Sequence, residues 1–433
     1  VPKEMTESTK LGVLMSFISL TIMVVLFFCE TFDFLFKSTK ISSHVDIDNK
    51  NYDQLLRLNF NITLYDVQCE FVEVDVWDTL GTNLQNITKD ITKWTIDEEG
   101  TQQRFHGRNK DQRKVAHETH NENALHEISE SNGGELHSTD LTPDTISNFL
   151  NEEHDVAIID YFAPWCIWCQ RLAPTWEKFA QEVQHEQHSS HVNKLGVGKV
   201  DCVAQQQMCK DERIMAFPTL RWYENGQPVM PDYRGDRTVD ALVEYATNRI
   251  HQNYDDKDEE FINGEHHPGC QVSGHLMVNR VPGNLHMEAK STNHAINSAM
   301  TNLTHRVHHF SFGSPDGLDG HLSDHILWQD FFPFYSDIPK KYQHTNPMKD
   351  KYYPTYHFHE AFHHHLKVIS THMNSRGSKV LYQILEESQL VMYDIQNVPE
   401  IKFLWDMSPM SVNVVKETDK HWYDYITSLL AII

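Results

Sequence analysis

Basic residues are scarce in this sequence, and their scarcity argues against two kinds of partner. Among 433 residues, 37 lysines and arginines stand against 61 aspartates and glutamates, a formal net charge of −24. Nucleic acids and anionic membrane surfaces both need clustered Lys and Arg side chains. We therefore expect no nucleic acid partner. Internal repeats and low-complexity tracts are also lacking, and a hydrophobic content of 39% is ordinary for two or three folded domains.

Long apolar runs occur at two places only. Residues 11–28 carry no charge, and a helix of this length just crosses a bilayer core of ~30 Å. The run lacks the small-residue cleavage pattern of a signal peptide, so we predict a retained transmembrane helix over 11–29. Lys3 and Lys10 precede the run, which favours a cytosolic N-terminal tail over residues 1–10.

The second apolar run, residues 426–433, continues to the last residue. We read residues 425–433 as the start of a second, truncated transmembrane helix, and the absence of Met at position 1 indicates truncation at the other end. A short buried C-terminal helix is the alternative. Three N-x-[ST] sequons lie between the two runs, on the side predicted to be luminal, and are candidate glycosylation sites: Asn61, Asn86 and Asn302.

The hydrophobic pattern divides the segment between the two apolar runs into several predicted parts. Alternating apolar and polar residues predict strands in residues 40–97 and again in 269–424, the two halves of one β-rich domain. Residues 138–250 have the order of a compact α/β unit inserted between these halves. Residues 98–137, with room for a frayed helix, and the acidic residues 251–268 are predicted to be linkers.

The most informative segment is YFAPWCIWC, residues 161–169. We predict that a buried strand ends shortly before Cys166 and that a helix begins there, so unpaired N–H groups and the helix dipole favour a thiolate at Cys166. Cys169 lies on the same helical face one turn deeper, so it can close a disulfide with Cys166 or resolve a mixed disulfide. We therefore predict that Cys166 attacks and Cys169 resolves.

A zinc knuckle is the alternative for a C-x-x-C sequence. It needs two further ligands, and Cys202 with Cys209 is the only candidate pair. The surrounding strand, helix, strand and Phe217-Pro218-Thr219 favour a redox site. We predict no metal and no cofactor, and we favour a structural disulfide between Cys202 and Cys209, with two buried thiols as the alternative.

These motifs resemble the thioredoxin fold of the protein disulfide isomerase family. The resemblance rests on YFAPWCIWC, GKVDC, FPT and YRGDRTVDALVEYA. It implies that Pro218 is cis and that Trp165, Phe217 and Pro218 lie where a client strand binds. The resemblance also implies roles for three charged residues. Asp160 is the buried proton acceptor for Cys169, and Lys199 is the charge partner of Asp160. Arg237 is a mobile arginine that lowers the pKa of the resolving thiol. Structural alternatives are a core ion pair for Asp160, a strand-entry proline for Pro218 and a solvated side chain for Arg237.

Ile167 and Trp168 depart from the family, which typically has Gly-His between the cysteines. Because that histidine stabilises the thiolate, we expect Cys166 to be less acidic and the dithiol a weaker oxidant than in a typical isomerase. Cys69 and Cys270, one in each half of the β-rich region, either pair or stay free. Cys29 lies at the membrane edge and is expected to be inert.

The β-rich halves resemble the cargo-receptor family of the ER–Golgi intermediate compartment (ERGIC). The resemblance rests on CEFVEVDVWDTLGTN, GCQVSGHLMVNRVPGNLHMEA, NLTHRVHHFSFG and LWDMSPMSV. It implies two membrane spans, a β-rich luminal domain and cycling between ER and Golgi. Plant and protist isomerase-like proteins fuse this domain to a thioredoxin module, so the fold class is an α/β thioredoxin-like domain inserted into a β-rich luminal domain, flanked by transmembrane helices.

Histidines gather at two places in the second half, residues 305–309 and 357–365. Strand alternation would place His357 and His359 on one face, as metal ligands or as a pH sensor. A polar strand surface is the alternative, and we favour it.

We expect a membrane-anchored thiol-disulfide oxidoreductase of the ER membrane and the ERGIC, with most of the chain luminal. Its expected partners are cysteine-containing secretory proteins, the ER/Golgi membrane and a possible ERGIC-family subunit. The alternatives are a cargo receptor whose thioredoxin module binds clients with little turnover, and an inert thioredoxin-like spacer.

Overall fold

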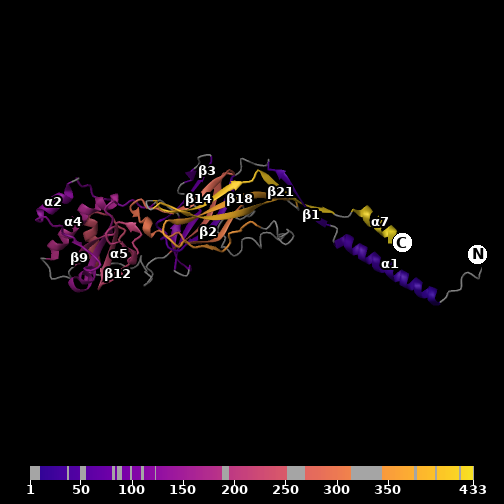
Figure 1. Cartoon of the computed structure of the whole chain (residues 1–433), viewed down its shortest axis with the longest axis horizontal. Coiled ribbons are helices and arrows are strands. Elements are labelled where there is room, and N and C mark those ends of the chain that lie inside the picture. Colours follow the sequence, from indigo (N-terminus) through magenta and orange to yellow (C-terminus); the bar gives the residue numbers. More distant parts are fainter. Residues whose placement is uncertain are drawn as a thin grey trace, which may run out of the picture.

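The computed structural model of the chain describes most of its length. The described residues are 10–36, 39–48, 55–79, 83–84, 90–97, 100–108, 112–121, 123–187, 195–250, 269–313, 344–374, 378–394, 397–418 and 421–432. The acidic segment 251–268, predicted to be a linker, and Asn86 lie outside these ranges. The molecule is elongated, with an α/β unit at one end, a β-rich body in the middle and two helices at the other end (Figure 1).

Helix α1 (Lys10–Phe36) comes from the uncharged N-terminal run and stands apart from the body. Its apolar side chains are exposed all round, such as Phe17 at 65% and Phe28 at 66%. Among the described residues it is the one helix long and apolar enough to cross a bilayer, over Lys10–Leu35. A helix that is apolar on every side is typical of a buried or a membrane-spanning segment, and most of the surface of α1 is exposed in this structure.

Helix α7 (Trp422–Ile432) lies beside α1, as Figure 1 shows. Tyr425 stacks on Phe34, with ring centroids 4.6 Å apart, and its hydroxyl lies 2.9 Å from Thr31 Oγ1. Leu430 is 67% exposed, so a short buried C-terminal helix, the alternative from sequence, is wrong in this structure.

The β-rich body consists of two sheets. The eight-stranded sheet has the order β1-β21-β18-β20-β14-β3-β4, with β19 paired to β18. The six-stranded sheet has the order β17-β16-β2-β13-β5-β6. Inward-facing residues of both sheets, Ile62 and Val272 from one and Met287 and Phe403 from the other, belong to one hydrophobic core. Alternating strand patterns supply this core because successive side chains point to opposite faces.

The strands of the body have the following bounds: β1 (Thr39–Ile47), β2 (Leu56–Leu64), β3 (Val72–Asp78), β4 (Asn83–Leu84), β5 (Ile91–Ile96), β6 (Gln102–Arg108), β13 (Gly269–Val278), β14 (Gly283–Ala289), β16 (His305–Phe312), β17 (Lys351–Tyr353), β18 (Glu360–Asn374), β19 (Ser378–Met392), β20 (Glu400–Met407) and β21 (Met410–Thr418).

The two halves of the body interleave. Strand β2 pairs antiparallel with β13, and β3 pairs with β14. A disulfide joins Cys69 to Cys270 across the same boundary, over a sequence separation of 201. The α/β unit therefore leaves and re-enters a single domain, as an insertion does.

Two segments differ from the sequence-based expectation. Residues 102–108, assigned to a linker, form β6 and pair with β5, which extends the six-stranded sheet. The remainder of that stretch includes helix α2 (Ala124–Ser131), which packs against the α/β unit. The sequence left room for a helix in this stretch, but its polar side chains hid strand β6, because one face of an edge strand is solvated. His357 and His359 lie in the turn before β18, not on a strand face.

The α/β unit has a five-stranded sheet of order β12-β11-β8-β9-β7. Strands β8 and β9 are parallel, and β11 runs antiparallel to β8. Successive residues of β8 enter two cores on opposite faces, since Ile159 packs with one and Ile158 with the other. The elements are β7 (Thr139–Asp140), β8 (Val156–Phe162), α4 (Ile167–Gln187), β9 (Leu195–Asp201), α5 (Gln206–Asp211), β10 (Ala216–Phe217), β11 (Thr219–Glu224), β12 (Gln227–Val229) and α6 (Val239–Ile250).

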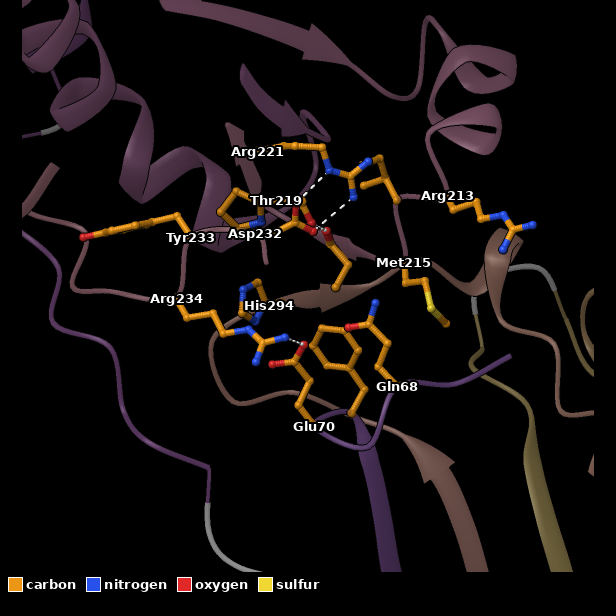
Figure 2. A pocket seen from close by; sticks show the side chains of 14 residues that line it. Gln68, Glu70, Arg213, Met215, Thr219, Arg221, Asp232, Tyr233, Arg234 and His294 are labelled. Carbon is orange, nitrogen blue, oxygen red and sulfur yellow. Dashed lines mark hydrogen bonds and ion pairs between the residues drawn. The ribbon is translucent and has the colours of Figure 1, made fainter. Parts of the chain in front are cut away.

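A polar interface joins the α/β unit to the β-rich body. Figure 2 shows a pocket at this junction, lined by residues of both parts. Glu70 of the body pairs with Arg234 of the α/β unit at 2.9 Å. Arg221 donates two hydrogen bonds of 2.7 and 3.1 Å to the Asp232 carboxylate, and this bidentate pair stiffens the α/β side of the pocket. Pro218 also lines this pocket, so the junction lies against the loop that faces the dithiol.

Candidate redox site

The dithiol lies where β8 gives way to α4. The chain turns after Phe162, the Cys166 N–H donates to the Ala163 carbonyl at 3.0 Å, and α4 begins at the next residue. Cys166 therefore occupies the N-terminus of a 21-residue helix, where backbone amides have no helical partner. The Cys169 N–H donates to Cys166 Sγ at 3.2 Å. Both cysteines are free thiols in the structure.

This environment favours a thiolate at Cys166. Its pKa is lowered to about 7, mainly by the hydrogen bond from the Cys169 thiol and also by backbone N–H groups of Cys169, Trp168 and Ala295, while burial opposes the shift. Helix N-termini lower cysteine pKa values in the same way. At neutral pH a large share of Cys166 is therefore nucleophilic.

Cys169 has the opposite environment. Burial raises its pKa far above the ordinary value, and the hydrogen bond to Cys166 and the charges of Asp160 and Cys166 add to the rise. Cys169 is 4% exposed. Two thiols three residues apart are thus driven to different protonation states, which is the requirement for one to attack and the other to wait.

Asp160 is the buried acid near this pair. It is 4% exposed on β8, and its Oδ1 has no hydrogen-bond partner among the described residues. Burial raises its pKa to about 7, and the nearby Arg237 guanidinium is the main opposing influence. A carboxyl group that titrates near neutrality can take a proton from a neighbouring thiol.

Lys199 does not form its direct ion pair with Asp160. Its Nζ lies 2.9 Å from Glu177 and 3.6 Å from Asp140. Although Lys199 faces Asp160 in the β8–β9 register, Arg237 acts more strongly on that carboxyl. Lys199 nevertheless lowers the pKa of Asp160 through its charge, less than Arg237 does, while its ammonium pairs directly with the buried Glu177.

Arg237 is buried, at 4% exposure, so a solvated side chain is the wrong description. Its guanidinium donates to the backbone carbonyl of Asn293 at 2.7 Å. Burial lowers its pKa, and Asp160, Cys169 and Cys166 oppose that shift. The positive charge of Arg237 therefore interacts electrostatically with Asp160 and with both cysteines.

The peptide bond between Phe217 and Pro218 is cis. The Phe217 carbonyl oxygen lies 3.5 Å from Cys166 Sγ, so this loop faces the attacking thiol. Trp165 packs edge-on against Phe217, with ring centroids 6.0 Å apart, and is 59% exposed. The three residues expected at a client strand thus lie together beside Cys166.

Two neighbours of the dithiol lie outside the α/β unit in the sequence, and the sequence analysis did not predict either of them. The His117 ring stacks on Trp168 at 5.3 Å, and Ala295 packs against the core that contains Cys166 and Cys169. Both residues belong to segments that flank the inserted unit. Neither segment has a motif of its own, so no sequence signal marks them.

The remaining cysteines separate by environment. Cys202 and Cys209 form a disulfide that closes a small loop between β9 and α5. Cys69 and Cys270 form the disulfide of the β-rich body. Cys29 is a free thiol exposed on α1. The dithiol is thus the one free thiol pair in the described part of the chain.

The sequons differ in access. Asn61 is 4% exposed on β2, and its amide oxygen accepts a hydrogen bond from Gln271 at 2.8 Å. A glycan on Asn61 is incompatible with this packing, so that assignment needs correction. Asn302 is partly buried and accepts a hydrogen bond from Thr355 Oγ1 at 2.7 Å.

One group of metal-ligand type occurs within the described ranges: Asp75, His286 and Glu288, with donor atoms within 4.8 Å of one another. The Lys290 ammonium lies 3.3 Å from Glu288 and already supplies positive charge there. Several histidines of the two clusters form side-chain hydrogen bonds, and His305 Nε2 lies 3.0 Å from His364 Nε2 in the core. We assign no cofactor to these residues.

Three family models match consecutive parts of the chain. The thioredoxin model covers residues 137–248, the ERGIC model residues 1–85, and the endoplasmic reticulum vesicle transporter model residues 240–433. These matches point to the ER and the early secretory pathway.

Relatives with the whole arrangement are similar at modest identity. Protein disulfide-isomerase 5-4 of Arabidopsis thaliana is 28% identical over 460 residues, which is 100% of this chain and 91% of the relative. Protein disulfide isomerase-like 5-4 of Oryza sativa subsp. japonica is 27% identical over 477 residues, again 100% and 91%. The crystal structure of Erv41p is 12% identical, with a TM-score of 0.37, over 86% of this chain and 99% of that one.

These matches confirm both resemblances seen in the motifs. The chain combines a thioredoxin domain with the ERGIC and endoplasmic reticulum vesicle transporter regions, in the manner of protein disulfide isomerase-like fusion proteins.

Proposed function

We propose that this protein is a membrane-anchored thiol-disulfide oxidoreductase that acts on secretory proteins in the lumen of the early secretory pathway. One observation carries the proposal: Cys166 and Cys169 share a helix N-terminus, yet the pKa of one is lowered to about 7 and that of the other is raised. A structural thiol pair has no need of this difference, whereas exchange chemistry depends on it.

In the proposed reaction, the Cys166 thiolate attacks one sulfur of a client disulfide. The S–S bond of the client breaks, its second sulfur leaves as a thiolate that takes up a proton, and Cys166 is joined to the client. Cys169 then gives its proton to Asp160 and attacks Cys166 Sγ. The client leaves as a dithiol, reduced by two electrons, and Cys166–Cys169 becomes the disulfide. Client oxidation follows the same steps in reverse.

Each neighbour has a part in this scheme. Asp160, with its pKa raised to about 7, receives the proton of the resolving thiol. Arg237 favours the ionised carboxyl and thiol once the proton leaves. Trp165 and the Phe217–Pro218 loop hold the client segment, and the charge of Lys199 favours the ionised form of Asp160 less than Arg237 does.

The test is a trapping experiment with the full chain. Cys169→Ala lacks the resolving thiol, so mixed disulfides between Cys166 and secretory proteins should accumulate and run as reducible adducts on gels. The matched control, Cys166→Ala with Cys169 intact, should give few adducts. Equal adduct levels in the two variants would contradict the proposal.

A cargo receptor is the second candidate function, favoured by the vesicle transporter match over residues 240–433. In that case the thioredoxin unit holds clients with little turnover. Export of clients from the ER should then persist in a Cys166→Ala/Cys169→Ala variant. Loss of export or of correct client disulfides in that variant favours the enzyme.

We also propose that α1 anchors the protein and that α7 begins a second span beside it. Support comes from the exposed apolar surface of α1 and from the contact of Tyr425 with Phe34 and Thr31. Retention of the full chain in membranes after alkaline carbonate extraction, with residues 40–424 protected from added protease in sealed vesicles, is the expected result.

A further inference from the structure

A segment of the β-rich body lies across the dithiol. Residues 293–297, called the strap here, follow β14 and include the short strand β15 (Ala295–Ile296). This strand pairs antiparallel with β10, with Ala295 opposite Phe217 and Ile296 opposite Ala216. Phe217 immediately precedes the cis proline, so the strap takes the backbone position at which a client strand is expected to bind.

The strap is fixed at both ends to the thioredoxin unit. At one end, the Asn293 carbonyl accepts a hydrogen bond from Arg237 at 2.7 Å. At the other, the Asn297 N–H donates to the Met215 carbonyl at 2.7 Å, and Asn297 Nδ2 donates to the Ile214 carbonyl at 3.1 Å. Between these anchors, Ala295 packs against the core that contains Cys166, and its backbone amide helps to lower the pKa of the Cys166 thiol.

A second segment, residues 113–118, supports the strap from the other side. The Asn293 side chain accepts from the Val115 N–H at 3.1 Å and donates to the Arg113 carbonyl at 2.6 Å. Two residues on, His117 stacks on Trp168 of the active-site turn. Cys166 is consequently only 1% exposed.

This enclosure conflicts with attack on a large substrate. A client sulfur must approach Cys166 Sγ in line with its own S–S bond, and the strap backbone stands in that space. The strap pairs with β10 through only two residues, and the hydrogen bonds of Asn293 and Asn297 hold its ends, so its release breaks this short ladder and a small set of named hydrogen bonds.

We infer that the strap is a built-in competitor for the client site, and that clients react only after they displace it. The inference rests on the proposed function and adds its regulation: the favoured client is an extended, cysteine-bearing segment that pairs with Phe217 in place of Ala295. Since the strap belongs to the β-rich body, a movement of that body relative to the thioredoxin unit would open or close the site.

The test measures access to Cys166 in the full, reduced chain held in detergent micelles. Iodoacetamide labelling of Cys166 is followed by peptide mass spectrometry at a pH of about 9, well above the pKa of about 7 in the wild type. Loss of the Ala295 N–H raises the pKa of Cys166 and by itself slows labelling, so faster labelling of a variant reports access. Ala295→Pro removes the N–H and cannot pair with Phe217. Its labelling rate should exceed that of the wild type by about tenfold or more. The matched control, Ala295→Ser, keeps the N–H and should label like the wild type.

Asn297→Ala provides a second opening variant that leaves the backbone of Ala295 intact. It removes the bond to the Ile214 carbonyl and should raise labelling by a smaller factor. A far-ultraviolet circular dichroism spectrum and a thermal unfolding midpoint like those of the wild type will show that each variant is folded. Wild-type labelling as fast as that of Ala295→Pro, with both folded, would overturn the inference.

The same variants separate this inference from the proposed function. Fast labelling of Ala295→Pro without reduction of a disulfide-linked peptide would uphold the strap and reject the oxidoreductase. Equal peptide reduction by the wild type and Ala295→Pro, with equal labelling, would uphold the oxidoreductase and reject the strap.

Discussion

The guanidinium of Arg237 hydrogen-bonds the backbone carbonyl of Asn293, 56 residues away in sequence and in the other domain. The same guanidinium is the main positive influence on Asp160. The charge balance of the dithiol and the position of the strap therefore depend on one side chain. Each of the following predictions isolates one part of this arrangement.

Asp160→Asn should slow the resolving step. In the wild type, resolution should speed up as the pH rises through about 7, because Asp160 must be ionised to accept the Cys169 proton. The variant should lose this pH dependence and accumulate mixed disulfides. Quenched-flow measurement of mixed-disulfide decay at several pH values tests this, and an unchanged pH profile would contradict it.

The same variant should change stability in the opposite sense. The folded-state pKa of Asp160 is raised from 3.8 to about 7, so the folded state binds the proton more tightly and loses stability as the pH rises from about 4 to 7. The amide that replaces the carboxyl group carries no charge to bury, so Asp160→Asn should gain roughly 2–4 kcal/mol relative to the wild type at pH 8. Below pH 4 the difference should vanish. Urea denaturation at both pH values measures it.

Cys166 should titrate near pH 7 in the reduced protein, as seen by thiolate ultraviolet absorbance. Cys169→Ala should move the midpoint upward, toward the ordinary value of 9.0, because the Cys169 thiol is the largest cause of the lowered pKa. Cys166→Ser, which has no such thiolate, gives the baseline. A midpoint unchanged by Cys169→Ala would show that backbone N–H groups alone hold the thiolate.

Lys199→Met should destabilise the fold more than it affects exchange. It leaves Glu177, 2% exposed, without its ammonium partner, and breaking such buried pairs costs about 3–5 kcal/mol. Resolution of mixed disulfides should stay within about twofold of the wild type, since Arg237 acts more strongly on Asp160. A large loss of resolution in a folded variant would restore Lys199 as the direct partner of Asp160.

Removal of the two structural disulfides should have unequal effects. Cys69–Cys270 spans a sequence separation of 201, whereas Cys202–Cys209 spans 7. A disulfide removes more chain entropy from the unfolded state when it closes a longer loop, so Cys69→Ala/Cys270→Ala should cost about 5 kcal/mol and Cys202→Ala/Cys209→Ala about 2.5 kcal/mol. Thermal unfolding of the two double variants compares them directly. Equal losses of stability in the two variants would mean that loop length does not determine how much each disulfide stabilises the fold.

Local pattern predicted the buried strand and the helix start of the thioredoxin unit, because each depends on neighbouring residues. The cis Pro218 that faces the dithiol followed from the resemblance to the protein disulfide isomerase family. In the structure, Cys166, Cys169 and Phe217-Pro218 come together. The contacts of Ala295 and His117 could not be predicted, since they arise where two domains meet and any small or flat side chain suits them. The register of β8 and β9 places Lys199 beside Asp160, whereas its direct ion pair is with Glu177 of α4, a contact that the local sequence does not reveal.

The interleaving of β2 with β13 sets an order of events during synthesis. Strand β2 ends at residue 64, and its partner begins at residue 269. At about 5–20 residues per second, a ribosome needs roughly 10–40 seconds to deliver that partner. The thioredoxin unit emerges complete within this interval, so it can fold first. The early strands of the β-rich body stay unpaired during this time, with their edges accessible to chaperones, until the second half of the body has been synthesised.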